Sequence, residues 1–294
     1  MVLVVDANAQ EMGTTAATKF FATVERVLAS PRTYRLAFDC EGVRLGRNGS
    51  IEVVSLCLED QSQAIKAPEV YLVDLATSSS PNGKQLRHQR VQALKLLFEC
   101  SEVRKVIHDC RIDSDALYHL CDIRLSNIHD TICFHQVISG EDYKNLNYVL
   151  SYNGISTNDA RDNSVYNSNQ SFWATRPLSQ KMIDWASSDV DKLLQVANRQ
   201  ENNLLQRGGR GTMSMKSAIT MSNKNIAFYR DVKCARGIRC QISHGQFIGR
   251  GGENIKRVQL QSGAAKIQFR EGSGWEVYYE HQHQLDHVKR EMGY

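Results

Sequence analysis

Short runs of apolar residues, each bounded by polar or turn-forming residues, recur through the first third of the chain. Four of them have the length and the content of branched and aromatic residues that are typical of β-strands. These predicted strands are RLAFDCE (35–41), SIEVVSLCL (50–58), EVYLVDL (69–75) and RKVIHD (104–109). The turn-forming sequence RNGS (47–50) separates the first two strands and predicts a hairpin-like connection between them.

Apolar residues spaced three or four positions apart predict helices between and after these strands. The helices are expected around 91–97, from about residue 113 through residue 120, and over 130–138, 144–153 and 178–198. Three strands, a helix, a fourth strand and further helices predict an α/β domain with a mixed sheet. In this domain the first three strands can form an antiparallel meander, and the fourth follows a helical crossover.

The composition of the chain changes after residue 198. The sequence RQENNLLQRGGRGTMSMKSAIT (199–220) is polar and contains Gly and Ser, which predicts a linker over 199–225. The remaining block, 226–294, predicts a smaller α+β domain. Its expected elements are a strand at 239–243, a helix at 251–263, strands at 265–271 and 275–280, and a helix at 281–292.

Charge divides the chain in a similar way. Residues 1–196 contain 20 Lys and Arg against 24 Asp and Glu, a net charge of −4. Residues 197–294 contain 16 Lys and Arg against 8 Asp and Glu, a net charge of +8. An acidic first part and a basic second part indicate two domains with different tasks, and the basic part is a candidate for binding a polyanion.

The chain has neither a run of apolar residues long enough for a membrane span nor the basic start of a secretory signal. Its eight cysteines form no CxxC pair, and most lie within apolar stretches. Such cysteines are typical of small buried side chains in a reducing compartment. We therefore expect an intracellular protein, cytoplasmic or nuclear, that does not associate with a membrane.

The stretch LAFDCEG (36–42) places two carboxylates at the end of a buried strand. Residues two apart in a strand point to the same face, so Asp39 and Glu41 would lie side by side and repel each other. A bound cation would remove this cost. The alternative is a strand end at which both acids turn into solvent and Gly42 begins a loop.

Two further acidic clusters lie on predicted helices. In HDCRIDSDAL (108–117), Asp113 is expected in the first turn of a helix. An acid there also complements the helix dipole, an alternative that applies equally to Asp109, Asp113 and Asp115. In KMIDWASSDVDKLLQVA (181–197), Asp189 lies at the edge of the apolar stripe and can face the sheet. Asp184 and Asp191 lie further round this helix and are predicted to be solvated.

Four acids on a strand and two helices could converge on one place. Such a set suits two divalent cations about 3.5–4 Å apart, as used for phosphodiester cleavage. Ligands that are all oxygen atoms favour Mg²⁺ or Mn²⁺.

These motifs together resemble the DEDD family of 3′–5′ exonucleases. FDCEG resembles the first motif, KVIHDCRIDSDAL the second and RPLSQKMIDWASSDVDKLL the third, and the resemblance covers residues 15–198. It implies a ribonuclease H-like mixed sheet with flanking helices and the release of nucleoside monophosphates from a 3′ end. The resemblance assigns the metal ligands to Asp39, Glu41, Asp113 and Asp189. It assigns a structural role to Asp130.

One position departs from the family. In the branch of ribonuclease D and its exosome-associated relatives, a Tyr four residues before the last Asp orients the attacking water. This chain has Trp185 there, and an indole offers one N–H donor and no acceptor. The related Egalitarian-like branch includes proteins that act mainly as RNA adaptors. The substitution predicts weakened catalysis or an RNA-binding adaptor; alternatively, Trp185 simply packs in the helix face.

The basic part carries a second resemblance. FIGRGGENIKRVQLQSGAAKIQF is similar to a KH domain, with a GxxG loop at Gly249–Gly252. The glycines let the backbone approach phosphates, and the following helix N-terminus favours anions. KH modules grip about four single-stranded nucleotides in this way. The expected nucleic-acid-binding residues are Ile248, Gly249, Arg250, Gly251, Gly252, Ile255, Lys256 and Arg257. The short lead-in over 242–249 predicts a truncated first KH helix.

The sequence therefore predicts a metal-dependent 3′–5′ exonuclease whose KH domain holds a single-stranded nucleic acid. RNA is expected over DNA because KH modules bind mostly single-stranded RNA. The competing prediction is an adaptor that keeps the fold and binds RNA without cleaving it.

Overall fold

The computed structural model describes residues 2–5, 15–63, 68–76, 80–162, 164–165, 169–207 and 209–294. The chain divides into two compact units, Met1–Ile226 and Ala227–Tyr294. No helix among the described residues combines the length and the apolar character that a membrane crossing requires.

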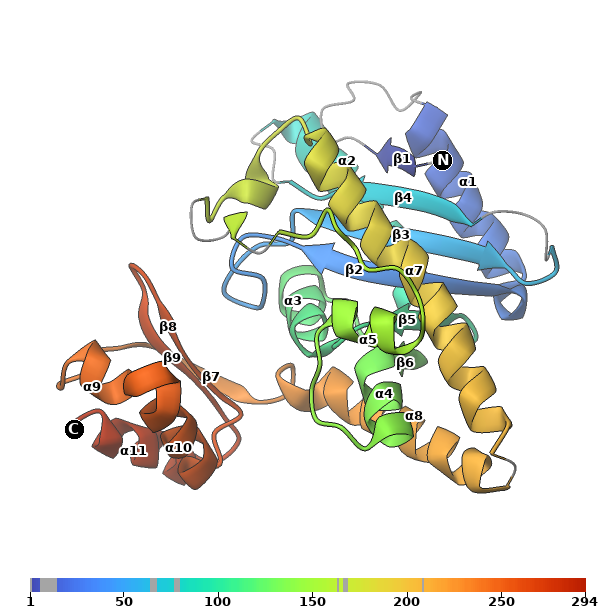
Figure 1. The fold of residues 1–294 in the computed structure, drawn as a ribbon. Coiled ribbons are helices and arrows are strands. Elements are labelled where there is room, and N and C mark those ends of the chain that lie inside the picture. Colours follow the sequence, from blue (N-terminus) through green and yellow to red (C-terminus); the bar gives the residue numbers. More distant parts are fainter. Residues whose placement is uncertain are drawn as a thin grey trace. The chain divides into compact units, whose positions relative to one another are not determined.

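The first unit is built on a six-stranded mixed sheet (Figure 1). Its strands, in chain order, are β1 (Val2–Val5), β2 (Tyr34–Glu41), β3 (Val53–Asp60), β4 (Glu69–Asp74), β5 (Arg104–Ile107) and β6 (Ile128–Asp130). They lie side by side in the order β1-β4-β3-β2-β5-β6. The pairs β2–β3 and β3–β4 are antiparallel, whereas β5 is parallel to β2. The predicted meander and the helical crossover are both confirmed, and β1 and β6 are strands that the pattern did not predict.

Helices cover both faces of this sheet (Figure 1). They are α1 (Thr15–Ala29), α2 (Pro81–Glu99), α3 (Arg111–Cys121), α4 (Thr131–Ser139), α5 (Leu146–Tyr152), α7 (Gln180–Leu205) and α8 (Gly209–Phe228), with short 3₁₀ turns at Pro31–Thr33 and Phe172–Ala174. Side chains of alternate residues in β2 point to opposite faces of the sheet. Leu36 and Phe38 pack in one core with α1, α2 and α3, whereas Ala37 packs in the other with α4, α5 and α7.

The segment 199–225, predicted as a linker, is instead largely helical. The helix α7 continues to Leu205 and α8 begins at Gly209; residue 208 lies outside the described residues. Leu204 and Ala218 are fully buried in a small core with Phe134. Three buried positions of α8 are spaced by four, and two of them are the small residues Ala218 and Ser222; the third is Ile226. This inner face is too small and too polar to show as an apolar stripe in the sequence.

The second unit is a three-stranded antiparallel sheet with helices packed on it (Figure 1). Its elements are β7 (Lys233–Ile238), α9 (His244–Ile248), a short turn (Arg250–Gly252), α10 (Glu253–Ser262), β8 (Lys266–Arg270), β9 (Gly274–Tyr279) and α11 (Gln282–Glu291), with sheet order β7-β9-β8. The core contains Phe247, Val258, Trp275, Val277 and Val288.

One strand of the second unit differs from its prediction. The strand expected at 239–243 lies earlier, at Lys233–Ile238. The residues that follow this strand do not extend the sheet. The Gln241 backbone N–H donates to the Met292 carbonyl at 2.8 Å, and the Ser243 hydroxyl caps α9. The following helix, α9, has only five residues, in line with the short lead-in to the Gly-rich loop.

Candidate metal centre and active site

The first two candidate acids lie where β2 leaves its neighbour β5. The β2–β5 pairing ends at Ala37 and Val106, so the edge of β2 beyond Ala37 has no strand partner in β5. Asp39 and Glu41 follow on this open stretch, while β3 still pairs with the other edge. Glu41 is buried and Asp39 is partly exposed. Both acids are therefore held by a rigid strand near the carboxyl end of the sheet.

The helix α7 brings a third acid to the same place. Asp189 is fully buried, and one carboxylate oxygen from each of Asp39, Glu41 and Asp189 lies within 4.8 Å of the other two. Asp184 and Asp191 are exposed on the same helix, as their positions off the apolar stripe predict. The three converging acids come from segments about 150 residues apart in the sequence.

Asp113 reaches this cluster from α3. Its Oδ1 accepts a hydrogen bond of 3.1 Å from the backbone N–H of Cys40, the residue between Asp39 and Glu41. Asp115, two residues further on, has another partner: it accepts from Arg47 at 2.7 Å and is buried. The structure therefore brings Asp39, Glu41 and Asp189 together, with Asp113 bonded to the backbone between the first two. The neighbouring Asp115 has a different partner, Arg47.

The electrostatics of this cluster favour a cation. Burial raises the pKa of Asp39 well above its ordinary value, and the charges of Asp113 and Asp189 raise it further. Burial and the charge of Asp39 likewise raise the pKa of Glu41 well above its ordinary value. Burial, followed by the charge of Asp109, raises the pKa of Asp113 to about 7. Buried carboxylates that repel one another and offer only oxygen donors fit a divalent cation such as Mg²⁺ or Mn²⁺.

Two residues that the motifs did not indicate contact Asp189. Arg161 Nη1 lies 3.4 Å from Asp189 Oδ2, and the charge of Arg161 lowers the pKa of Asp39 and Glu41 against the effect of burial. Asn158 is buried and donates from Nδ2 to Asp189 Oδ1 at 2.8 Å. Both lie in the segment between α5 and α7, about 30 residues before Asp189, where no periodic pattern predicts a contact.

Trp185 is fully buried beside this centre. Its ring centroid lies 5.6 Å from that of Trp173, edge to face at 74°. It belongs to a cluster with Val53, Leu72, Trp173, Met182 and Ala186. Burial raises the pKa of Asp189, whereas Arg161, Asn158 and the indole group of Trp185 lower it. The Trp185 side chain thus packs in the core and also lowers the pKa of Asp189.

The Gly-rich loop of the second unit follows α9. Gly249, Gly251 and Gly252 have φ values of 74°, 62° and 80°, a region that L-residues with a side chain rarely adopt. A Cβ on Gly249 would lie 2.8 Å from Asn254 Cγ. The backbone conformation at these three positions thus favours glycine. At Gly249 a side chain would also clash with Asn254.

The other candidate residues of this loop differ in their surroundings. Arg250 and Lys256 are exposed, and Ile248 and Ile255 pack partly buried against the core of this unit. Arg257 forms an ion pair of 2.9 Å with Glu291 on α11. Of the three basic side chains, Arg250 and Lys256 therefore present their charges to solvent most directly.

Comparison with known proteins agrees with the geometry of the first unit. Residues 14–205 match the family model described as 3′-5′ exonuclease. No curated protein matches the chain.

Solved structures share the fold at low sequence identity. RNase D from Trypanosoma brucei in complex with GMP is 20% identical, with a TM-score of 0.57 over 78% of this chain and 64% of that chain. The same enzyme in complex with RNA U12 gives 20% identity and a TM-score of 0.55 over 78% of this chain and 70% of that chain.

A mutant catalytic core of RRP6 from Trypanosoma brucei is 17% identical, with a TM-score of 0.58 over 89% of this chain and 61% of that chain. This chain thus spans less than two thirds of the RRP6 core and of RNase D in its GMP complex. The family model, in contrast, covers well over half of this chain and includes Asp39, Glu41, Asp113 and Asp189. This chain therefore belongs to the 3′-5′ exonuclease family.

Proposed function

We propose that this chain is a metal-dependent 3′–5′ exoribonuclease that removes nucleotides from the 3′ end of single-stranded RNA. One observation carries the proposal: oxygens of Asp39, Glu41 and Asp189 lie within 4.8 Å of one another, and Asp113 is bonded to the backbone between the first two. Carboxylates this close together and largely buried repel one another, which is costly unless a cation binds them.

Asp39, Glu41, Asp113 and Asp189 would hold two divalent cations, Mg²⁺ or Mn²⁺. Such a pair supplies an activated water and stabilises the charge on the leaving oxygen of a phosphodiester. The protein itself orients the ligands. Asn158 fixes one oxygen of Asp189 at 2.8 Å, and the Cys40 amide fixes one oxygen of Asp113 at 3.1 Å. Arg161 offers a positive charge beside Asp189 that an incoming phosphate could share.

We assign RNA capture to a KH domain formed by the second unit. The order of its elements, strand, two helices, two strands and helix, and its antiparallel sheet support this assignment. The left-handed glycines of the loop and the exposed Arg250 suit a close approach to backbone phosphates. The preference for RNA rests on this resemblance and on the RNA complex of a protein that shares the fold of the first unit.

A specific observation favours a second candidate function, an RNA-binding adaptor with weak or absent cleavage. Trp185 is fully buried against Trp173 and offers no acceptor to a water. The four acids argue for the enzyme, since an adaptor has no need of them.

A cleavage assay separates these functions. Full-length protein is incubated with a 5′-labelled single-stranded RNA, or with DNA of the same sequence, in Mg²⁺, Mn²⁺ or EDTA. The proposal expects a ladder that shortens from the 3′ end of RNA, needs the cation and disappears in Asp39→Asn. RNA binding without cleavage in either metal would support the adaptor, and faster cleavage of DNA would indicate a deoxyribonuclease.

The position of Trp185 is tested in the same assay with two variants of similar size. Trp185→Tyr restores a hydroxyl, whereas Trp185→Phe removes the indole without adding one. Faster cleavage by Trp185→Tyr than by Trp185→Phe would show that a hydroxyl at this position aids catalysis. Equal rates would show that the residue only packs.

A further inference from the structure

The end of α8 is bonded directly to Ser114, which follows Asp113, and through Asp130 to the turn that precedes this acid. From these contacts we infer that Ser222 and Asn225 of α8, together with Ser114 of α3, are positioning residues that hold Asp113 for metal binding. The inference rests on the proposed metal-dependent function, and it adds α8 to the catalytic unit. This helix lies beyond residues 14–205, which the family model covers.

Asp130 is the centre of these contacts. Its carboxylate is fully buried and accepts from the backbone N–H of Asp109 at 2.8 Å and of Cys110 at 3.1 Å. The N–H of Ile132 adds a bond of 3.3 Å. From α8, Asn225 Nδ2 donates to Oδ2 of the same carboxylate at 2.9 Å. Four donors therefore hold one buried charge, which makes the Asp130 carboxylate a fixed support.

The two amides that Asp130 holds form the turn before α3. Asp109 has a φ of 60°, a left-handed conformation that costs a residue with a side chain about 1 kcal/mol. The helix begins at Arg111, so Asp113 lies in its first turn. Any change in this turn would therefore move the start of α3, and with it the carboxylate that bonds to Cys40.

A second bond fixes the other side of Asp113. Ser114, which is buried, donates from Oγ to the backbone carbonyl of Ile226 at 2.7 Å. This carbonyl lies in the last turn of α8, where a helix leaves its carbonyl groups without intrahelical partners. The hydroxyl of Ser114 thus satisfies the end of α8 and anchors α3 to it.

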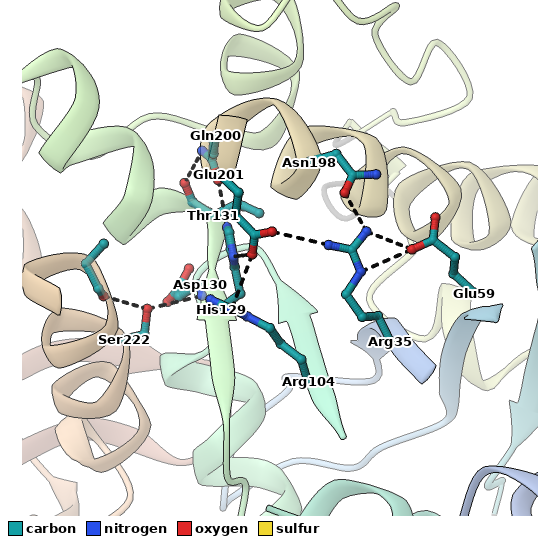
Figure 2. A network of polar contacts seen from close by, with 11 residues as sticks. Arg35, Glu59, Arg104, His129, Asp130, Thr131, Asn198, Gln200, Glu201 and Ser222 are labelled. Atoms are coloured by element: carbon teal, nitrogen blue, oxygen red, sulfur yellow. Dashed lines mark hydrogen bonds and ion pairs between the residues drawn. The ribbon is translucent and has the colours of Figure 1, made fainter. Parts of the chain in front are cut away.

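Ser222 sets the position of α8 against the sheet. Its Oγ accepts from the Asp130 backbone N–H at 3.2 Å and donates to the Ala218 carbonyl at 2.9 Å (Figure 2). On the neighbouring side, His129 bonds to Gln200 and Glu201 of α7 (Figure 2). The strand β6 is therefore clamped between α7 and α8, and Asp130 at its end cannot shift without breaking these bonds.

The magnitude of the effect follows from other metal sites. Groups that orient a metal ligand typically contribute 10- to 100-fold in metal affinity, an order-of-magnitude range. We therefore expect Asn225→Ala and Ser114→Ala each to weaken Mn²⁺ binding by about 10-fold. Asn225→Asp keeps the shape of the side chain but sets a carboxylate against Asp130, and we expect a larger loss from it.

The test uses the full-length chain and two measurements that need no cleavage. Mn²⁺ affinity is measured by titration calorimetry without RNA, and amide hydrogen exchange is followed at residues 109–114. The variants should weaken Mn²⁺ binding and speed exchange in this segment. The matched control is Asn223→Ala, an exposed position on the same helix, which should change neither.

The outcomes separate this inference from the proposed function. Variants of Asn225 and Ser114 with wild-type Mn²⁺ affinity and wild-type exchange at 109–114 would overturn it. If the wild type binds Mn²⁺ but degrades no RNA, the proposed function fails and the affinity comparison still decides the inference. If the wild type binds no Mn²⁺, or a variant melts near the assay temperature, exchange measured at lower temperature decides it: unchanged exchange in Asn225→Ala refutes the inference.

Discussion

The backbone N–H of Cys40 donates a hydrogen bond of 3.1 Å to Oδ1 of Asp113. Cys40 lies between Asp39 and Glu41 on β2, so this bond joins the first acidic motif to the second across 73 residues. It forms where β5 no longer pairs with β2, and the side chain of Asp113 takes the place of a strand partner. The bond therefore attaches Asp113 to the part of β2 that extends past β5 and carries Asp39 and Glu41.

The acid cluster should make the metal-free protein less stable than a variant with one charge fewer. Burial and the charges of Asp113 and Asp189 raise the pKa of Asp39. Keeping this carboxylate ionised in the folded protein at neutral pH therefore lowers the free energy of unfolding. We expect Asp39→Asn to melt at a higher temperature than the wild type in EDTA. Added Mn²⁺ should raise the melting temperature of the wild type more than that of the variant, as followed by circular dichroism.

The same variant should lose at least about 10²-fold in RNA cleavage, because metal stabilisation of the transition state amounts to several kcal/mol. Asp191→Asn is the control, since Asp191 is an exposed acid on the same helix as Asp189. An equal response of the wild type and Asp39→Asn to Mn²⁺ would contradict a metal role for Asp39.

Two adjacent leucines test the helical assignment of the segment predicted as a linker. Leu204 is fully buried, whereas Leu205 is 67% exposed. Leu204→Ala should lower the free energy of unfolding by about 2–5 kcal/mol, because it leaves a cavity against Phe134. Leu205→Ala should stay within about 0.5 kcal/mol of the wild type in urea unfolding. Similar small effects at both positions would indicate that the segment does not pack.

Lys105 predicts a dependence of stability on pH. Burial lowers the pKa of this lysine from 10.5 to about 7, while Nζ donates to the Cys100 carbonyl at 2.6 Å. Between these two values the unfolded chain binds more protons than the folded one, so the contribution of Lys105 to stability rises with pH. Below about pH 7 both states are protonated and the penalty is constant.

Lys105→Met should therefore be more stable than the wild type at pH 7, by on the order of a few kcal/mol. The difference should shrink as the pH approaches 10, as measured by urea unfolding at each pH. Lys216→Met, at an exposed position, supplies the control with no such trend. A constant difference between pH 7 and pH 10 would show that Lys105 is charged in the folded protein.

Two glycines separate RNA binding from backbone strain. Gly251 and Gly272 have φ values of 62° and 76°, and neither has an atom within 4 Å of an added Cβ. Asp at either position bears the same left-handed strain, about 1 kcal/mol. Gly251→Asp should reduce RNA affinity in a gel shift, because it sets a negative charge in the Gly-rich loop, and Gly272→Asp should not. Equal losses would remove this loop from the RNA site.

Much of the fold could be predicted from local pattern. The strands at 35–41, 50–58 and 69–75 and the helices of the acidic motifs have periodic apolar residues, and the structure contains each of them within a few residues. β6 escaped prediction because three residues are too few for a period, and the four residues of β1, VLVV, are all apolar and show no alternation. The helix α8 escaped it because its inner face uses Ala218 and Ser222.

The candidate site divides in the same way. By itself, the sequence determined which acids could act: a strand end indicated Asp39 and Glu41, and a helix face indicated Asp189. The resemblance to the exonuclease motifs selected Asp113 among the acids near it. Only the tertiary structure decided what surrounds them: Arg161 and Asn158 beside Asp189, Trp185 within the core, and α8 against Asp130. The physical reason is range. A strand or helix periodicity acts over a few residues, whereas these contacts join segments that only the packing of the sheet and its helices brings together.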